Sequence, residues 1–383
     1  MKKVISICVV VFILLNSVAT FAADQSIISY KTALQRTLEN NWELKRIKYA
    51  EYQANQQYKD AQKFADEISI NAIKEYYATI PDKSLDEYTE MQILKQRDLV
   101  PKQVQYNITQ AQDQYKVTEK SLSNGLRGLY LNALSTDFTV QTNNKRLALA
   151  EKRYRQDKVK FQQGNISQLD IEQSEYNYLK AQQAVADSAR RRENAIRNLN
   201  QFIGEPINRM YDKVVFDDGF DYKKLQRLDF YVEKALKERV DISDIEAQIQ
   251  LKKLEMSIME KNDVHKIYRA GRSEYSNLQS EVESLQLKLQ QTRIDIEKNI
   301  KDAYIDIQKD LSTIKGLEST LESQKKLLNK MREQWKLGVL TESSIEDMEI
   351  NIEEGEYNLL LAIYNCNTKY QQLENAAGYG PAY

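Results

Sequence analysis

Cysteine, histidine, proline and glycine are all scarce in this chain. Its 383 residues include 2 Cys, 1 His, 4 Pro and 11 Gly. Cys8 lies in the apolar N-terminal segment, so Cys366 is the one thiol beyond it, and one thiol cannot form an intrachain disulfide. A lone His far from that thiol also excludes the usual zinc-ligand sets, and we expect no metal or other cofactor. With few helix breakers, the composition is typical of long helices and coiled coils.

Long apolar runs are lacking beyond the N-terminus. Two lysines precede the apolar run Val4–Leu15, and Ala22 ends a small-residue cleavage pattern, so residues 1–22 are predicted to be a secretory signal peptide. A lipoprotein signal would need a Cys at the cleavage point, and Cys8 lies inside the run instead. No later stretch approaches the ~18 apolar residues of a membrane-spanning helix. We therefore expect an exported chain without a further spanning helix.

An excess of charge of one sign is also lacking. Without the two lysines of the predicted signal peptide, the 55 basic residues become 53, against 56 acidic ones, for a formal charge of −3. Charges of both signs are interspersed along the chain. This near-neutrality argues against nucleic acid or an anionic membrane surface as the main partner.

One sequence unit occurs twice. The stretch "VKFQQGNISQLDIEQSEY" interrupts a helical pattern at Gly164, and "QWKLGVLTESSIEDMEI" interrupts another at Gly338, 174 residues later. The same offset relates Tyr130 to Tyr304 and Gly204 to Gly378. Three landmarks at one spacing indicate an internal duplication. We place the units at residues 23–204 and 231–383, joined by an irregular linker at 205–230 with one short strand near Val214–Phe216.

The pattern of apolar residues predicts what each unit contains. Spacings of three and four residues run from Leu278 to Leu321 and from Ile345 to Leu373, which is a coiled-coil seam. Each unit is predicted to have a leading helix, a long outgoing helix, a tip and a return helix. The outgoing helices, at 101–163 and 275–337, would each be about 95 Å long. Helices of that length must lie along neighbours, so we predict an all-α fold of long antiparallel coiled-coil hairpins.

These features together resemble the TolC-like outer membrane efflux family, also called outer membrane factors. The resemblance is carried by the signal peptide, the duplication, the opening "ALQRTLENNWEL", the Gly-containing tip followed by "LDI", and the ending "NLNQFIG". It covers residues 26 to about 379. The resemblance implies a homotrimer whose helices close into a hollow cylinder, the α-barrel. It also implies a non-enzymatic conduit that docks an adaptor (membrane fusion protein) and an inner-membrane pump.

The sequence departs from that family at one place. The family continues its cylinder with a β-barrel, whose strands need alternating stretches of ~9–11 residues. The second unit offers only "NDVHKIYRAGRSEY", and the first offers "IPDKSLDEYTEMQILKQRDLVP", which is charged without alternation and suggests a capped helix starting at Ser84. We expect the barrel strands to be absent and the chain to be almost wholly helical. Contact with a membrane then stays open, and a protein that spans the cell wall of a single-membrane bacterium fits as well.

The two tips are the first candidate sites. Glycine permits the positive φ that ends a helix, and Ser167 and Thr341 are placed to cap the helices that follow. The resemblance implies that the tips contact an adaptor. The alternative is a plain turn between helices. The candidate contact residues are Gly164, Asn165, Ile166, Gly338, Val339 and Leu340.

Polar residues just beyond the tips are the second candidates. The resemblance places a pore constriction at Ser344, Glu346 and Asp347, with Ser344 standing where the family often has an acid. A solvated helix face is the more ordinary explanation of the same residues. Asp170 matches a family position that links neighbouring helices, although Leu340 replaces the usual basic partner.

Two functions remain open from the sequence. The first is an exported TolC-like component of an efflux or export conduit. The second is a structural coiled coil of the cell envelope that conducts nothing. We predict no enzyme activity, because no catalytic constellation is present in the sequence.

Overall fold

A computed structural model describes residues 27–80, 84–217, 221–261 and 263–380 of the chain. The predicted signal peptide lies outside these ranges. The contacts divide the chain into two compact units. Unit 1 comprises residues up to Asn40, Ser123–Tyr222 and Ile307–Thr368, and unit 2 comprises Asn41–Leu122, Lys223–Asp306 and the residues from Lys369 on. Each unit takes in segments of both sequence repeats, and the boundaries of the repeats stay a prediction.

The described residues are almost entirely helical. Two strands, β1 and β2, pair in parallel, with Ile28 opposite Val214. The all-α prediction is confirmed for the described residues, as is the short strand near Val214. The elements are β1 (Ile27–Ser29), α2 (Tyr30–Asn40), α3 (Trp42–Glu67), α4 (Ile70–Ala78), α5 (Glu87–Leu94), the π-helical segment η1 (Lys95–Leu99), α6 (Val100–Gln162), α7 (Gln168–Ile203), β2 (Lys213–Val215), η2 (Tyr222–Lys224), α8 (Leu228–Glu238), α9 (Val240–Lys261), α10 (Val264–Ile267), α11 (Arg269–Lys336) and α12 (Glu342–Gly378).

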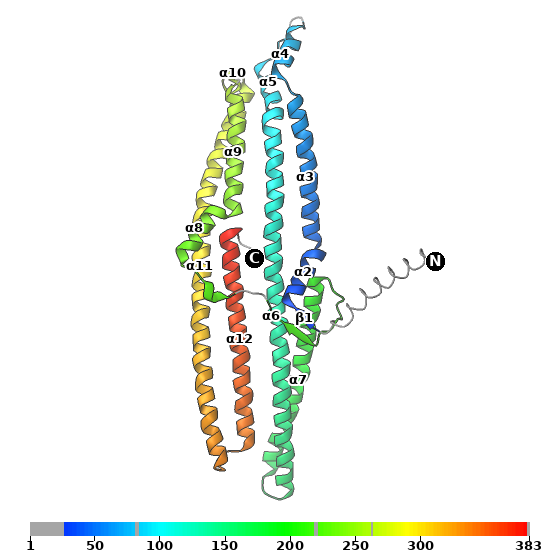
Figure 1. Ribbon diagram of the computed structural model, residues 1–383, viewed down its shortest axis with the longest axis vertical. Coiled ribbons are helices and arrows are strands. Elements are labelled where there is room, and N and C mark those ends of the chain that lie inside the picture. Colours follow the sequence, from blue (N-terminus) through cyan, green and yellow to red (C-terminus); the bar gives the residue numbers. More distant parts are fainter. Residues whose placement is uncertain (1–26, 81–83, 218–220, 262, 381–383) are drawn as a thin grey trace, which may run out of the picture. The chain divides into compact units, whose positions relative to one another are not determined.

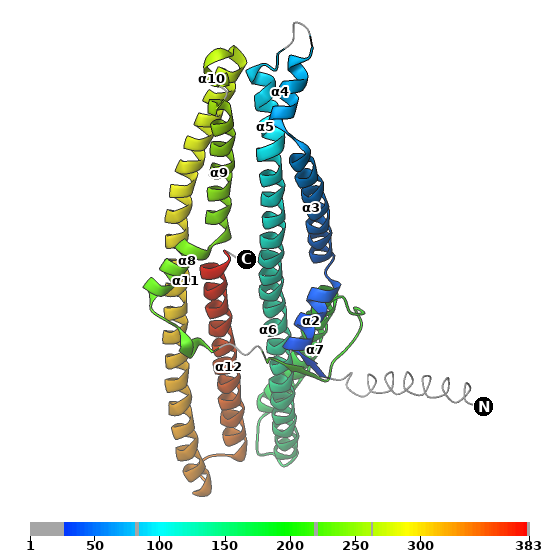
Figure 2. The same ribbon diagram turned by 45° about the horizontal axis from the view of Figure 1, so that its top comes forward.

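Two antiparallel hairpins make up most of unit 1. Figures 1 and 2 show α7 returning along α6 and α12 returning along α11. The α11–α12 seam is filled by Leu321, Leu328, Ile345 and Ile352. This is the seam that the spacing of apolar residues predicts.

A second core of unit 1 surrounds the strand pair. The Tyr30 and Tyr130 rings meet edge to face, 5.7 Å apart, and the Tyr130 hydroxyl donates to the carbonyl oxygen of Ile28. The buried Arg127 guanidinium lies 5.0 Å from the centre of the Tyr30 ring. Ile196 and Leu199 of α7 complete this core. This core holds one end of the α6–α7 hairpin. The other end is the turn between the two helices, which is one of the two predicted tips.

In unit 2, α3, α4, α5, η1, α8, α9 and α10 pack with the N-terminal part of α6 and with the part of α11 up to Asp306. Ile245 and Ile249 of α9 pack on Val282 of α11. The segment between α3 and α6 forms α4 and α5, and α5 is capped by Asp86, whose carboxylate accepts from the Thr89 amide at 2.9 Å. The predicted cap at Ser84 was therefore wrong by two residues, because an aspartate oxygen reaches the amide three residues on.

One charged group is buried in the apolar cluster formed by α5, η1, α9, α10 and α11. The Lys95 ammonium lies 2.8 Å from a carboxylate oxygen of Glu255 and 2.6 Å from one of Glu274. Burial alone would lower the pKa of Lys95, but the hydrogen bonds to the two carboxylates outweigh it, and the pKa is raised. Lys95 thus joins the α5–η1–α6 run to α9 and α11.

No helix within the described ranges combines the length and the hydropathy that crossing a bilayer requires.

Candidate functional site: two helical tips and a charged seam

Both tips end their outgoing helices with the same backbone motif. Gly164 and Gly338 each have φ of +75°. The Gly164 amide donates to the Phe161 carbonyl at 2.9 Å, and the Asn165 amide donates to the Lys160 carbonyl at 2.8 Å. Gly338 and Val339 make the same two bonds to Trp335 and Gln334, at 2.8 and 2.9 Å. This is the Schellman motif, and it confirms the predicted role of the glycines as helix ends. We name residues 160–171 tip 1 and residues 334–345 tip 2.

Tip 1 begins its return helix with a complete capping box. The Ser167 hydroxyl accepts from the Asp170 amide at 3.3 Å, and the Asp170 carboxylate accepts from the Ser167 amide at 2.9 Å. Hydrogen bonds from the Ser167 hydroxyl and backbone hold the pKa of Asp170 below its ordinary value. The Asp170 side chain is therefore engaged inside its own helix, and its role as an interhelix link stays a prediction.

The apolar side chains of the tips are unevenly exposed. Ile166 and Leu340, which are related by the repeat offset, are half-buried, whereas Val339 is exposed. The structure adds two exposed residues that the sequence reasoning missed, Leu169 and Leu337. The exposed fractions are 79% for Leu337, 73% for Leu169 and 68% for Val339. The signal for Leu169 and Leu337 was present, since both are apolar residues off the helix seams.

Two of the three predicted constriction residues, Glu346 and Asp347, lie against basic side chains of α6, whereas the Ser344 hydroxyl lies 2.9 Å from that of Thr341. The Lys152 ammonium lies 2.7 Å from a carboxylate oxygen of Glu346 and 2.7 Å from one of Glu342. Hydrogen bonds to these two carboxylates raise the pKa of Lys152. The Arg153 guanidinium lies 3.9 Å from Asp347. The carboxylates of Glu346 and Asp347 are thus partly neutralised within the chain.

The same seam continues along the two helices. Arg146 lies 2.7 Å from Glu354 and donates to the Asn351 side chain at 2.9 Å, and Lys145 pairs with Glu353. The basic residues fall at 145, 146, 152 and 153, a repeat of seven residues along one face of α6. A seven-residue repeat returns to the same face of a helix, so α6 presents a charged stripe to α12. We call these contacts the charged seam.

A cavity of about 450 Å³ lies beside the charged seam in unit 1. Asp170 and Asp347 both line it, so the structure brings together two residues that the sequence analysis assigned to separate roles. Arg146 and Arg153 also line this cavity, as do Asp157 and Ser174. The Ser174 hydroxyl donates to the Asp157 carboxylate at 3.0 Å. The cavity lining carries charges of both signs beside apolar side chains.

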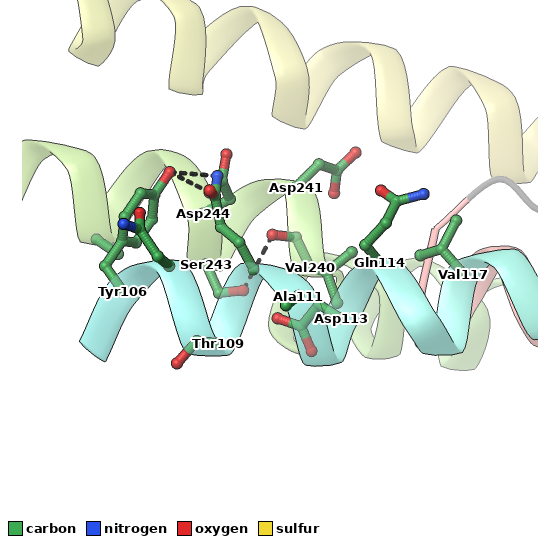
Figure 3. A pocket seen from close by; sticks show the side chains of 13 residues that line it. Tyr106, Thr109, Ala111, Asp113, Gln114, Val117, Val240, Asp241, Ser243 and Asp244 are labelled. Atoms are coloured by element: carbon green, nitrogen blue, oxygen red, sulfur yellow. Dashed lines mark hydrogen bonds between the residues drawn. The ribbon is translucent and has the colours of Figure 1, made fainter. Parts of the chain in front are cut away.

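A second cavity, of about 510 Å³, lies between α6 and α9 in unit 2 (Figure 3). The Tyr106 hydroxyl donates to Asp244 at 2.6 Å, and the Gln110 amide donates to the same carboxylate oxygen at 3.0 Å. Burial, followed by the hydrogen bond to Asp244, raises the pKa of Tyr106 to about 12. Tyr106 therefore stays a hydrogen-bond donor at neutral pH and joins the two helices.

Within the described ranges, no three or more His, Cys, Asp or Glu side chains are grouped as a metal ion would require.

Comparisons with known proteins find the same fold in solved outer membrane channels. No protein-family model and no curated protein matches the sequence. Among solved structures, the Campylobacter jejuni outer membrane channel CmeC matches with a TM-score of 0.63 at 13% identity, covering 92% of this chain and 86% of its own. The Vibrio cholerae outer membrane protein VceC matches with a TM-score of 0.62 at 11% identity, covering 92% and 96%.

A third match is CusC, solved in a study of conformational changes that accompany folding and transmembrane channel formation. Its TM-score is 0.61 at 14% identity, and the match covers 92% of each chain. Sequence identities this low do not allow a function to be transferred from these proteins to this chain. Each match nevertheless covers nearly the whole of both chains. The chain therefore has the TolC-like helical fold of these outer membrane channels.

Proposed function

We propose that this chain is an exported, non-enzymatic component of an efflux or export conduit in the cell envelope. Three copies would close their helices into a tube, through which small molecules or proteins pass. The observation that carries the proposal is the match to solved channels over 92% of this chain and 86–96% of theirs. A fold shared over that length includes the hairpins from which a tube is built.

The tips are the proposed docking end. Leu169 at the start of α7, and Leu337 and Val339 at the turn after α11, are exposed apolar side chains. Exposed apolar surface can mark a protein interface. An adaptor of the membrane fusion type would bind at tips 1 and 2 and connect the conduit to an inner-membrane pump. Gly164, Asn165, Ile166, Gly338 and Leu340 would shape this surface.

The residues beyond the tips are proposed to set the width of the passage. Ser344, Glu346 and Asp347 would form the constriction, and Asp170 would link neighbouring helices there. In this chain Lys152 and Arg153 lie against the two acids. The constriction would therefore carry little net charge while the charged seam is intact, and would become acidic when it separates.

Imaging of the purified mature chain tests the conduit. We expect hollow particles with three-fold symmetry. Solid rods or monomers would overturn the proposal and favour the structural coiled coil.

Docking is tested separately in source cells with a photo-crosslinking residue at position 339 and a control at Ile207, which is also exposed. We expect position 339 to capture a protein of the adaptor class, identified by mass spectrometry. Equal capture at the two positions would contradict docking at the tips.

A further inference from the structure

The two tips share a backbone motif but begin their return helices by different means. At tip 1, Ser167 and Asp170 satisfy each other's backbone amides. The first amides of a helix have no partner inside the helix, and here two of them are satisfied by residues of α7 and its cap. The start of α7 thus depends on no other helix for its capping.

At tip 2 the residue in the position of Asp170 is Ser344, 174 residues later. Serine has no carboxylate that could reach back to the cap amide. Its hydroxyl lies 2.9 Å from that of Thr341. The reciprocal box of tip 1, in which a carboxylate accepts from the cap, is therefore not available to α12.

The first turns of α12 are held by α6 instead. Lys152 bridges Glu342 and Glu346, one turn apart, at 2.7 Å each. The Arg153 guanidinium donates to the carbonyl oxygen of Ser343 at 2.8 Å. The apolar seam with α11 begins only at Ile345. The three residues before Ile345 therefore have their main side-chain support from another hairpin.

The position that corresponds to each of these residues in the other repeat lacks this chemistry. Gln168 and Glu172, which correspond to Glu342 and Glu346, bond to each other at 2.7 Å. Lys326, which corresponds to Lys152, pairs with Glu322 of its own helix at 2.6 Å. The position of Arg153 is taken by Leu327. The two tips therefore differ in their side chains, although their outgoing helices end in the same backbone motif.

We propose that tip 2 is ordered conditionally, by contact with α6, whereas tip 1 is ordered by itself. When the two hairpins of unit 1 separate at the charged seam, the start of α12 loses its supports and frays, and α7 keeps its capping box. Order at tip 2 and contact between the hairpins are then coupled equilibria. A ligand that binds the folded form of tip 2 would hold the hairpins together, and a ligand that binds the frayed, acidic form would separate them. This inference goes beyond the conduit proposal and does not depend on it.

Hydrogen exchange of the full mature chain, followed by mass spectrometry, tests the inference. The variant Lys152→Gln/Arg153→Gln should accelerate exchange in residues 342–350 roughly 5-fold or more, because three charge-assisted contacts are lost. Residues 168–176 should change by less than about 2-fold. Lys326→Gln removes the lysine at the matched position of the other repeat and is the control, which should leave both tips unchanged.

Variants of the caps provide the reciprocal test. Ser167→Ala should accelerate exchange in residues 168–176, because α7 relies on that side chain, and Thr341→Ala should have the smaller effect on residues 342–350. The inference is overturned if the Lys152→Gln/Arg153→Gln chain keeps its helical circular dichroism and exchanges residues 342–350 at the original rate, or if both tips accelerate equally. A chain that forms hollow three-fold particles but gives either result would disprove this inference and leave the conduit intact.

Discussion

Two glycines within α11 occupy opposite environments. A Cβ on Gly271 would lie under 3.0 Å from the carbonyl oxygen of Val264 in α10, so only glycine allows the chain to fold back this closely. Nothing lies within 4 Å of a Cβ placed on Gly316. A methyl group added at the first position must displace backbone, whereas at the second it only reduces the freedom of the unfolded chain.

The substitution Gly271→Ala should lower the free energy of unfolding by about 1–3 kcal/mol, the usual cost of overpacking. Gly316→Ala should raise it by up to about 1 kcal/mol, because alanine is the better helix former. Urea denaturation followed by circular dichroism measures both. Equal shifts of the two midpoints would show that the approach of α10 to α11 does not constrain Gly271.

At the scale of elements, the junction of α5, η1 and α6 depends on one ion-paired lysine. Lys95 is buried and lies between Glu255 of α9 and Glu274 of α11. Its pKa is raised, so its contribution to stability is fully present below the unfolded-state pKa of about 10.4 and is lost as pH rises through the higher folded-state value. The ion pairs therefore support the junction throughout the neutral range.

Lys95→Met keeps a long side chain but leaves two carboxylates without their cation. We expect the free energy of unfolding at pH 7 to fall by about 1–3 kcal/mol, with the loss relative to the original chain shrinking above about pH 10.4. Lys102→Met, at an exposed position of α6, is the control and should change little. Adding Glu255→Gln and Glu274→Gln to Lys95→Met should recover part of the loss, and no recovery would contradict the ion-pair account.

The sequence correctly predicted those elements whose signals lie in residues close together in the chain. The glycines of the tips, the α11–α12 seam and the strand near Val214 follow from backbone freedom, helical periodicity and β-branched residues that stand close together in the chain. The partners of Glu346 and Asp347 did not follow, because Lys152 and Arg153 both precede them by 194 residues. Contacts between residues so far apart in the sequence depend on how the hairpins pack. A charged residue on a helix surface could equally face solvent, so the sequence does not reveal its partner. The segment η1 was also missed, since a π turn leaves no periodic signature in five residues.

At the scale of the whole molecule, each of the two compact units is assembled from three separate stretches of chain. In unit 2, Met91 and Leu94 from the first repeat pack with Ile258 and Leu278 from the second. A single predicted repeat therefore carries only part of this cluster. The two predicted repeats complete each other here within one chain.

Residues 23–230 expressed alone should consequently be less helical than their share of the intact chain. The α3–α5 region should be the most affected, because its apolar partners are missing. Co-expression with residues 231–383 should restore both helicity and a single peak in size-exclusion chromatography. A fragment 23–230 that is monomeric and fully helical by circular dichroism would show that each repeat folds by itself.

The π-helical segment η1 has a further consequence for the phase of the helices on either side of it. The Val100 amide donates to the Lys95 carbonyl, five residues back, so this turn holds one residue more than an α-helical turn. One extra residue rotates everything beyond it by about 100° around the axis. Loss of a single residue between 95 and 99 would turn Met91 and Leu94 away from their cluster while leaving α6 in register. The segment thus rotates α5 relative to α6 about their common helix axis. The two ends of one continuous helical run can therefore face differently oriented sets of neighbours.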